Sequence, residues 1–238
     1  MKAKKVCLST IYVILMSQDS DKDVVSIGMK NLDVLLDTDG IPVGTVGTLV
    51  SNPQSSGYRL LLNMLMDQPE EAAILSNNRD SEDILGDIGT KFQGDTTPAV
   101  SQIHGNDIDE VIDEIMQLEY EDLSVIIIDS IEGVSGINDS QKISSLRRLA
   151  SEAEFTVLMH YIEQPKDNIF PFDLSEVIYT SDFVFALMKK RLEQSIRQQF
   201  VFHRLPAGCG VDTNQIDIPL VEVEFISRSL AVDSGERI

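Results

Sequence analysis

Residues 50–62 read V-S-N-P-Q-S-S-G-Y-R-L-L-L, and this stretch decides the fold. An apolar, β-rich run from Val43 to Val50 leads into a turn of small residues that closes at Gly57. A leucine-rich segment follows and can begin a helix. The resulting order of strand, loop and helix is that of a phosphate-binding loop.

The residue types that bind phosphate are replaced in this loop. In the pattern G-x-x-x-x-G-K-[ST], the glycines let backbone N–H groups surround the phosphates, the lysine neutralises charge and the hydroxyl holds magnesium. Those four positions hold Asn52, Gly57, Tyr58 and Arg59, so only the second glycine is kept. Tyr58 has no charge to offer a phosphate, and Arg59 cannot coordinate a metal.

Length and composition favour one large folded domain. The chain has 238 residues, of which 42% are hydrophobic, which is enough to bury a full core. We expect residues 16–238 to form a single domain. Residues 1–15 are interpreted as an N-terminal extension, because the apolar run after the first lysines is too short to span a bilayer and no small-residue cleavage site follows. A genuine strand or an anchor is the alternative, and we expect a cytoplasmic protein.

The charge balance is strongly acidic. The formal net charge is −20 and the pI is near 4.3. Such a surface repels nucleic acid and anionic membranes at low salt, so no membrane partner is expected. The alternative is an adaptation to a high-salt cytoplasm, as in a halophilic archaeon, where charges are heavily screened. In that case the charge says little about partners.

Cysteine and histidine spacing predicts neither a metal site nor a catalytic triad. Cys7 and Cys209 lie far apart in the sequence, which excludes a disulfide framework or a zinc pattern. The three histidines, at 104, 160 and 203, fall in separate segments and are expected to be structural. The segment 133–136 lacks the G-x-S-x-G spacing of a serine hydrolase.

Periodicity predicts alternating strands and helices. We expect strands at 45–51, 72–76, 100–103, 124–130 and 155–161, and helices at 58–66, 81–88, 107–118 and 140–154. A short helix is also expected from Leu32 onward, before the first core strand. This alternation is typical of a doubly wound parallel sheet. After a helix at 172–180, strand-like runs at 183–188, 196–203 and 220–226 have no helices between them and predict an antiparallel extension.

Two segments resemble the KaiC-like branch of the RecA-like ATPases. Residues 31–44, N-L-D-V-L-L-D-T-D-G-I-P-V-G, are similar to that family's opening G-L-D-x-L-L-G-G-G-I-P-x-G. Asp129 ends an apolar strand and is followed by Ser130, like the family's Walker B aspartate. The resemblance covers residues 25–232. It implies an α/β, RecA-like P-loop NTPase fold: a three-layer sandwich with a mostly parallel central sheet and a C-terminal antiparallel extension.

The chain departs from the family pattern in ways that predict loss of ATP hydrolysis. The family places acidic residues after the second strand to polarise the attacking water, but Asn77, Asn78 and Arg79 stand there and cannot accept a proton. Of the family's basic K-x-R pair, only Arg204 is kept, with Pro206 in the other place. Each loss removes transition-state stabilisation.

The resemblance implies a degenerate nucleotide site and a subunit interface. The site comprises Asn52, Ser55, Ser56, Gly57, Tyr58, Arg59 and Asp129, with ATP and magnesium as possible ligands, Asp129 as the metal ligand and no catalytic residue. The predicted interface comprises Lys189, Lys190, Arg191 and Arg204, in a homo- or hetero-oligomer of RecA-like subunits. Phe200 and Phe202 lie among these basic residues, which leaves single-stranded DNA as an alternative partner, although strand alternation points them into the core.

Three functions follow from these patterns. The first is a regulatory or scaffolding subunit that acts through protein contacts. The second is an ATP-binding protein in which Arg59 substitutes for the missing lysine and hydrolysis is weak or absent. The third is a DNA-associated accessory protein related to recombinases.

Overall fold

The computed structural model describes residues 24–28, 33, 36, 40–53, 57–91, 96–103, 106–118, 122–163, 175–191, 196–207, 209, 220–226 and 229–233. Several predictions lie outside this part of the chain. They concern the extension 1–15, Ser55 and Ser56 of the loop, and the side chains of Lys189, Lys190 and Arg191.

A single large sheet forms the centre of the molecule. Its strands are β3 (Val46–Ser51), β4 (Ala72–Ser76), β5 (Ala99–Gln102), β6 (Val125–Asp129), β7 (Thr156–Ile162), β8 (Phe183–Arg191), β9 (Ile196–Arg204), β10 (Leu220–Ile226) and β11 (Ser229–Asp233). Within the described residues their order is β11-β10-β9-β8-β3-β7-β6-β4-β5. All pairs from β8 to β5 are parallel, and the pairs from β8 to β11 are antiparallel. The predicted mostly parallel sheet with an antiparallel extension is confirmed.

One strand joins the two parts of the sheet. The run 183–188 was expected in the antiparallel extension, and β8 does pair antiparallel with β9, but its other neighbour is β3, with which it pairs in parallel, with Leu49 opposite Phe185. The antiparallel part therefore begins at the β8–β9 pair. Local periodicity could not show this, because a strand's direction depends on which strand it pairs with.

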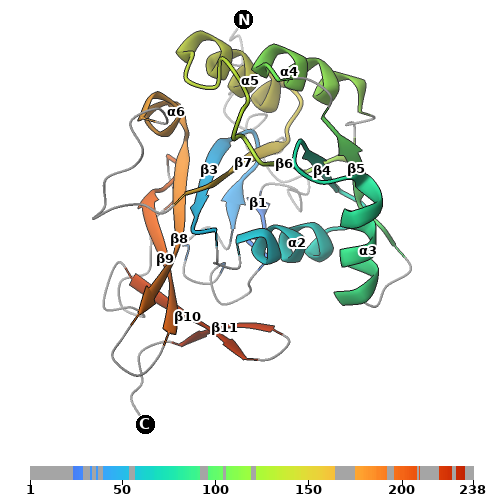
Figure 1. Cartoon of the computed structure of the whole chain (residues 1–238). Helices are drawn as coiled ribbons and strands as arrows, with labels where there is room; N and C mark the ends of the chain where they lie inside the picture. Colours follow the sequence, from blue (N-terminus) through green and yellow to red (C-terminus); the bar gives the residue numbers. More distant parts are fainter. Residues whose placement is uncertain are drawn as a thin grey trace, which may run out of the picture.

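Helices cover both faces of the sheet. They are α2 (Gly57–Asp67), α3 (Ser81–Lys91), α4 (Ile108–Gln117), α5 (Ser140–Glu152) and α6 (Ser175–Thr180). Figure 1 shows α2 and α3 on one side and α4 and α5 on the other. Each side has its own core, and β6 contributes to both: Ile127 packs on the α2 side, and Ile126 and Ile128 pack on the α4–α5 side. This explains the uninterrupted β-branched run of β6.

The lead-in to β3 forms a second, small sheet that the sequence did not predict. β1 (Val24–Val25) pairs antiparallel with β2 (Ile41–Pro42). Asp33 is 8% exposed and accepts hydrogen bonds from Ile27 N at 2.6 Å and Ser26 Oγ at 2.7 Å.

In the described part of the chain, no helix has the length and apolar character needed to cross a bilayer.

Candidate functional site

Three neighbouring parallel strands bring a serine, a histidine and an aspartate together at their carboxyl ends. Ser51 ends β3, His160 lies in β7 and Asp129 ends β6. Ser51 Oγ lies 2.8 Å from His160 Nε2, and His160 Nδ1 lies 2.7 Å from Asp129 Oδ1. Ser51 and His160 are each 1% exposed, and Asp129 is 2% exposed. The three side chains therefore form one buried hydrogen-bonded chain.

The hydrogen-bond chemistry of this Ser51–His160–Asp129 chain fixes the histidine ring. A carboxylate only accepts hydrogen bonds, so Nδ1 of His160 donates to Asp129. In a neutral imidazole the other nitrogen, Nε2, then accepts from the Ser51 hydroxyl. All three polar side chains have partners, which is the condition for burying them without a large desolvation cost.

Gly57, the first residue of α2, lies directly against the side chains of Ser51 and His160. A Cβ atom on Gly57 would lie 2.4 Å from Ser51 Oγ and 2.9 Å from His160 Nε2. Those distances are far inside van der Waals contact, so no side chain fits at this position. The glycine predicted to let the loop approach a phosphate here lets α2 approach Ser51 and His160.

Arg79 enters the predicted nucleotide site from the end of β4. Its guanidinium carbon lies 3.8 Å from the centroid of the Tyr58 ring, which is a cation–π contact. Its Nε lies 3.9 Å from Asp129 Oδ2, and its Nη1 lies 3.6 Å from Asp87 Oδ2. Asp129 therefore has His160 at one carboxylate oxygen and Arg79 near the other.

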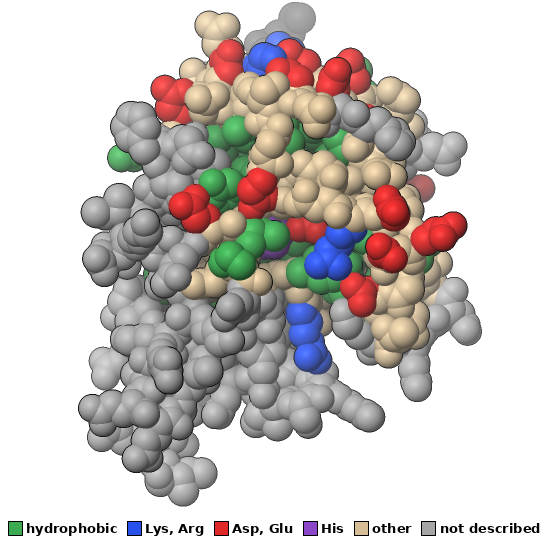
Figure 2. All heavy atoms as spheres, in the orientation of Figure 1, with side chains coloured by type: hydrophobic (Ala, Val, Ile, Leu, Met, Phe, Trp, Pro, Cys, Tyr) green, Lys and Arg blue, Asp and Glu red, His purple; other side chains and the backbone are tan. Residues whose placement is uncertain are grey.

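Burial makes the Tyr58 hydroxyl harder to ionise. Removal from water raises the pKa of the Tyr58 hydroxyl to about 12, although the nearby Arg79 charge acts to lower it. At neutral pH the site thus contains a neutral phenol and a guanidinium. Figure 2 shows this face, with acidic side chains around basic ones near the middle of its described surface.

Asn77 and Asn78 connect the ends of β4 and β6. Asn77 Oδ1 accepts from Ser130 N at 3.0 Å, and Asn77 Nδ2 donates to Glu132 O at 3.2 Å. Asn78 Nδ2 donates to Ser130 Oγ. The two amides hold the segment after Asp129 in place, at the position where the resembling family has acidic residues.

The remaining predicted site residues have simple environments. Asn52 is 7% exposed, and its backbone N–H donates to Leu187 O at 3.3 Å. Arg59 is half-buried in the first turn of α2. Among the residues that the structure describes, no three His, Cys, Asp or Glu side chains gather as a metal site.

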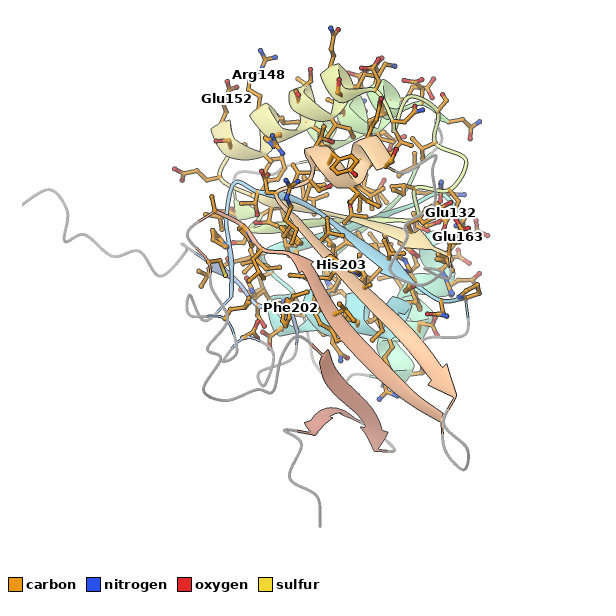
Figure 3. The ribbon with its side chains drawn as sticks, turned by 90° about the vertical axis from the view of Figure 1, so that its left-hand side faces the viewer. Glu132, Arg148, Glu152, Glu163, Phe202 and His203 are labelled. Carbon is orange, nitrogen blue, oxygen red and sulfur yellow. The ribbon has the colours of Figure 1, made fainter. Side chains whose placement is uncertain are left out.

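Two carboxylates near these strand ends were missed by the sequence analysis. Glu132 accepts a hydrogen bond from Ile162 N, and Glu163 Oε2 accepts from the Tyr161 hydroxyl at 2.8 Å. Figure 3 shows Glu132 and Glu163 at the same end of the molecule. Glu132 connects the segment after β6 to the end of β7, whereas the contact of Glu163 lies within the end of β7, and no sequence pattern marks either role.

The predicted interface residue Arg204 and the two phenylalanines near it lie on β9. Phe200 is fully buried, and its ring centroid lies 5.2 Å from those of Phe185 and Phe202. Arg204 Nη1 donates to Tyr179 O at 2.7 Å and Ser181 O at 2.9 Å, at the end of α6. Burial lowers the pKa of His203, which Figure 3 labels beside Phe202. The phenylalanines thus face the core, and Arg204 contacts its own chain.

The fold is that of a KaiC-like, RecA-superfamily protein. The chain is similar to the crystal structure of the KaiC-like protein PH0186 from the hyperthermophilic archaeon Pyrococcus horikoshii, with a TM-score of 0.68 and 11% sequence identity. The similarity covers 88% of this chain and 98% of that one.

A sequence family of unknown function covers most of the chain. The chain belongs to the family of unknown function DUF7125, whose model matches residues 24–229. No curated protein matches the sequence.

Proposed function

We propose that this chain is a catalytically degenerate KaiC-like protein that acts as a regulatory or scaffolding subunit through protein contacts. The observation that carries the proposal is the position of Arg79, on the Tyr58 ring and 3.9 Å from Asp129. A site of this fold needs free positive charge for the nucleotide phosphates and a free carboxylate for magnesium. Here the guanidinium and the carboxylate lie next to each other.

Magnesium binding at Asp129 would be costly for this arrangement. The ion would have to replace the His160 contact at 2.7 Å or enter beside the Arg79 guanidinium, which carries the same sign of charge. The other family features are also replaced, because Tyr58 and Arg59 follow Gly57 where a lysine and a hydroxyl are needed. A degenerate Walker A loop accounts for these substitutions together. The acidic composition is a separate feature, for which we propose a halophilic origin.

The proposed partners are RecA-like subunits in a cytoplasmic homo- or hetero-oligomer. The basic residues Lys189, Lys190 and Arg191 follow the buried part of β8 in a chain of net charge −20, so an acidic surface of a neighbouring subunit is the complementary partner. Arg204 is proposed as a further interface residue, at the other end of the β8–β9 hairpin, where it pairs with Val184 and contacts the end of α6.

Nucleotide binding tests the proposal. Titration calorimetry with Mg-ATP in high-salt buffer should give no binding heat at millimolar ligand, and the purified protein should show no ATP turnover. The result that overturns the proposal is steady ATP hydrolysis that Asp129→Ala abolishes.

An ATP-binding protein without hydrolysis is the second candidate. It is favoured by Gly57, which still starts an 11-residue helix at the loop, because a helix N-terminus attracts anions. In this candidate Arg59 supplies the substitute cation. A measurable Mg-ATP affinity that falls in Arg59→Ala would establish it. The DNA-associated function has less support, since Phe200 is buried and does not offer a stacking surface.

A further inference from the structure

A cavity at the amino end of the parallel sheet lies away from the predicted nucleotide site. It has a volume of about 500 Å³, and its described lining comes from α5, the turn before β3, Asp182 before β8 and Ala207 after β9. Sites for small molecules usually have volumes of roughly 300–1,000 Å³. We propose that this cavity binds a small molecule that carries an oxyanion, a phosphate or a carboxylate, and that Arg147 and Arg148 hold this group.

Arg147 is held in a fixed orientation at the cavity. Its Nε lies 3.2 Å from Asp182 Oδ2, and its Nη2 lies 3.0 Å from Asp182 Oδ1. Asp182 is itself held by the backbone N–H of Val46, which donates to Oδ2 at 2.9 Å. A guanidinium has five N–H donors. Within the described residues, the contact with Asp182 uses only the donors of Nε and Nη2, so Nη1 is left for a ligand.

Neighbouring positions on α5 extend this surface of hydrogen-bond donors. Ser144, Arg147, Arg148 and Ser151 all line the cavity, and their spacing of three or four residues places them on one face of the helix. The Arg148 side chain is 73% exposed, with its Nε 4.0 Å from Glu152 Oε1, and Figure 3 shows both side chains at the surface of α5. The Arg148 guanidinium can therefore turn toward a bound anion. Guanidinium groups bind phosphate and carboxylate through two parallel hydrogen bonds.

The charges of the lining favour an acid that also carries hydroxyl groups. Two arginines lie among two carboxylates, Glu152 and Asp182, so the lining is electrically balanced in a chain of net charge −20. Asp182 is offset by Arg147, whereas the Glu152 side chain is 71% exposed. A carboxylate such as Glu152 accepts hydrogen bonds from hydroxyl groups. Small polyol phosphates and polyol carboxylates are the matching ligand class.

Titration calorimetry on the full chain at constant ionic strength tests the proposal. The probes are glycerol 3-phosphate, glycerate and glycerol, which share a carbon skeleton with hydroxyl groups, although only the first two carry an acid. We expect saturable binding heat from at least one acid at millimolar concentration and none from glycerol. The acid that binds more tightly identifies the preferred oxyanion.

Two arginine variants test the assigned contacts. Arg148→Gln removes an exposed charge and should weaken binding about tenfold or more, which is the loss of one charge-assisted hydrogen bond. Arg147→Lys keeps a positive charge beside Asp182 but loses the planar fork. It should weaken binding by a similar factor while the midpoint of denaturant unfolding changes little.

Ser144 and Ser145 provide a matched pair of positions on α5. Both are exposed, and each hydroxyl donates to the carbonyl four residues earlier, at 2.7 Å and 3.2 Å. Of the two, Ser144 lines the cavity. Ser144→Trp should fill the cavity and abolish binding, whereas Ser145→Trp should leave it unchanged. The proposal is overturned if neither acid gives binding heat, or if Ser144→Trp binds as tightly as the parent protein, whatever the calorimetry with Mg-ATP shows.

Discussion

The two ends of the parallel sheet handle polar groups in opposite ways. At the carboxyl end, the Ser51–His160–Asp129 chain is almost fully buried, and each member contacts the next. At the amino end, Arg147 pairs with Asp182 at 3.0 Å with side chains 39% and 26% exposed. There, α5 and the starts of β3 and β8 border a cavity of about 500 Å³ that Gly44, Thr45 and Asp182 help to line.

This difference predicts where substitutions will matter. A buried polar group that loses its partner keeps its full desolvation cost, whereas an exposed one regains water. Single substitutions at the carboxyl end of the sheet should therefore lower the free energy of unfolding strongly, and those at the amino end should change it little. Figure 3 shows Arg148 and Glu152 pointing outward from α5, away from the core.

The largest effect is expected from His160→Ala. This change leaves Asp129 as a buried carboxylate without its 2.7 Å partner and also creates a cavity. Removing the hydrogen-bond partner of a buried group costs about 1–3 kcal/mol, and more when that group is charged. Denaturant unfolding in high-salt buffer would measure the loss. A change below about 1 kcal/mol would show that water or Arg79 satisfies Asp129 on its own.

Gly57→Ala should be the next most damaging change. The added Cβ would lie 2.4 Å from Ser51 Oγ and 2.9 Å from His160 Nε2, so α2 must shift. Overpacking of this kind costs about 1–3 kcal/mol. Gly86→Ala is the matched control, because a Cβ there meets nothing within 4 Å in α3. It should stabilise the protein by up to about 1 kcal/mol, and an equal loss in both variants would contradict the packing argument.

Arg79→Ala should have an intermediate effect. The Arg79 side chain is 40% exposed. The variant therefore loses only the contact with the Tyr58 ring and part of the positive charge that offsets Asp129. About 1 kcal/mol is expected. The more informative measurement is Mg-ATP calorimetry on this variant, since removing the guanidinium vacates the place beside Asp129. Stability unchanged at both low and high salt would argue that Arg79 makes no net contact in solution.

The smallest effect is expected from Arg148→Ala at the opposite end. Arg148 and Glu152 are 73% and 71% exposed, and their closest atoms are 4.0 Å apart. Exposed i,i+4 pairs contribute about 0.3–0.5 kcal/mol, and high salt reduces this further. Unfolding curves of the variant and the parent protein should nearly coincide. A loss comparable to that of Arg79→Ala would remove the contrast between the two ends.

Most of the fold was predictable because its signals are local. The buried run of β6 and the amphipathic spacing of α4 and α5 gave those elements to within two residues. The small β1–β2 sheet was missed because its strands have two residues each. β11 was missed as well, and the parallel pairing of β8 with β3 was not predicted. Such short or pairing-dependent features carry no periodicity of their own.

The candidate site was predictable only in its location. The loop residues Gly57 and Tyr58 and the strand-end Asp129 were singled out from their spacing, and the structure places them around one another. Arg79 was interpreted only as a missing base, and its contact with the Tyr58 ring joins residues from two different elements. His160 was expected to be structural, and its buried contacts with Ser51 and Asp129 join three strands that are distant in the sequence.

The sequence by itself determined the alternation of elements and the order of strand, loop and helix around residues 50–62. Those properties depend on neighbours along the chain. Only the tertiary structure decided that Ser51, His160 and Asp129 meet, since Ser51 and His160 are 109 residues apart and His160 and Asp129 are 31 apart. The sheet order β3-β7-β6 brings their strand ends together. Strand order results from long-range pairing, which no local pattern encodes.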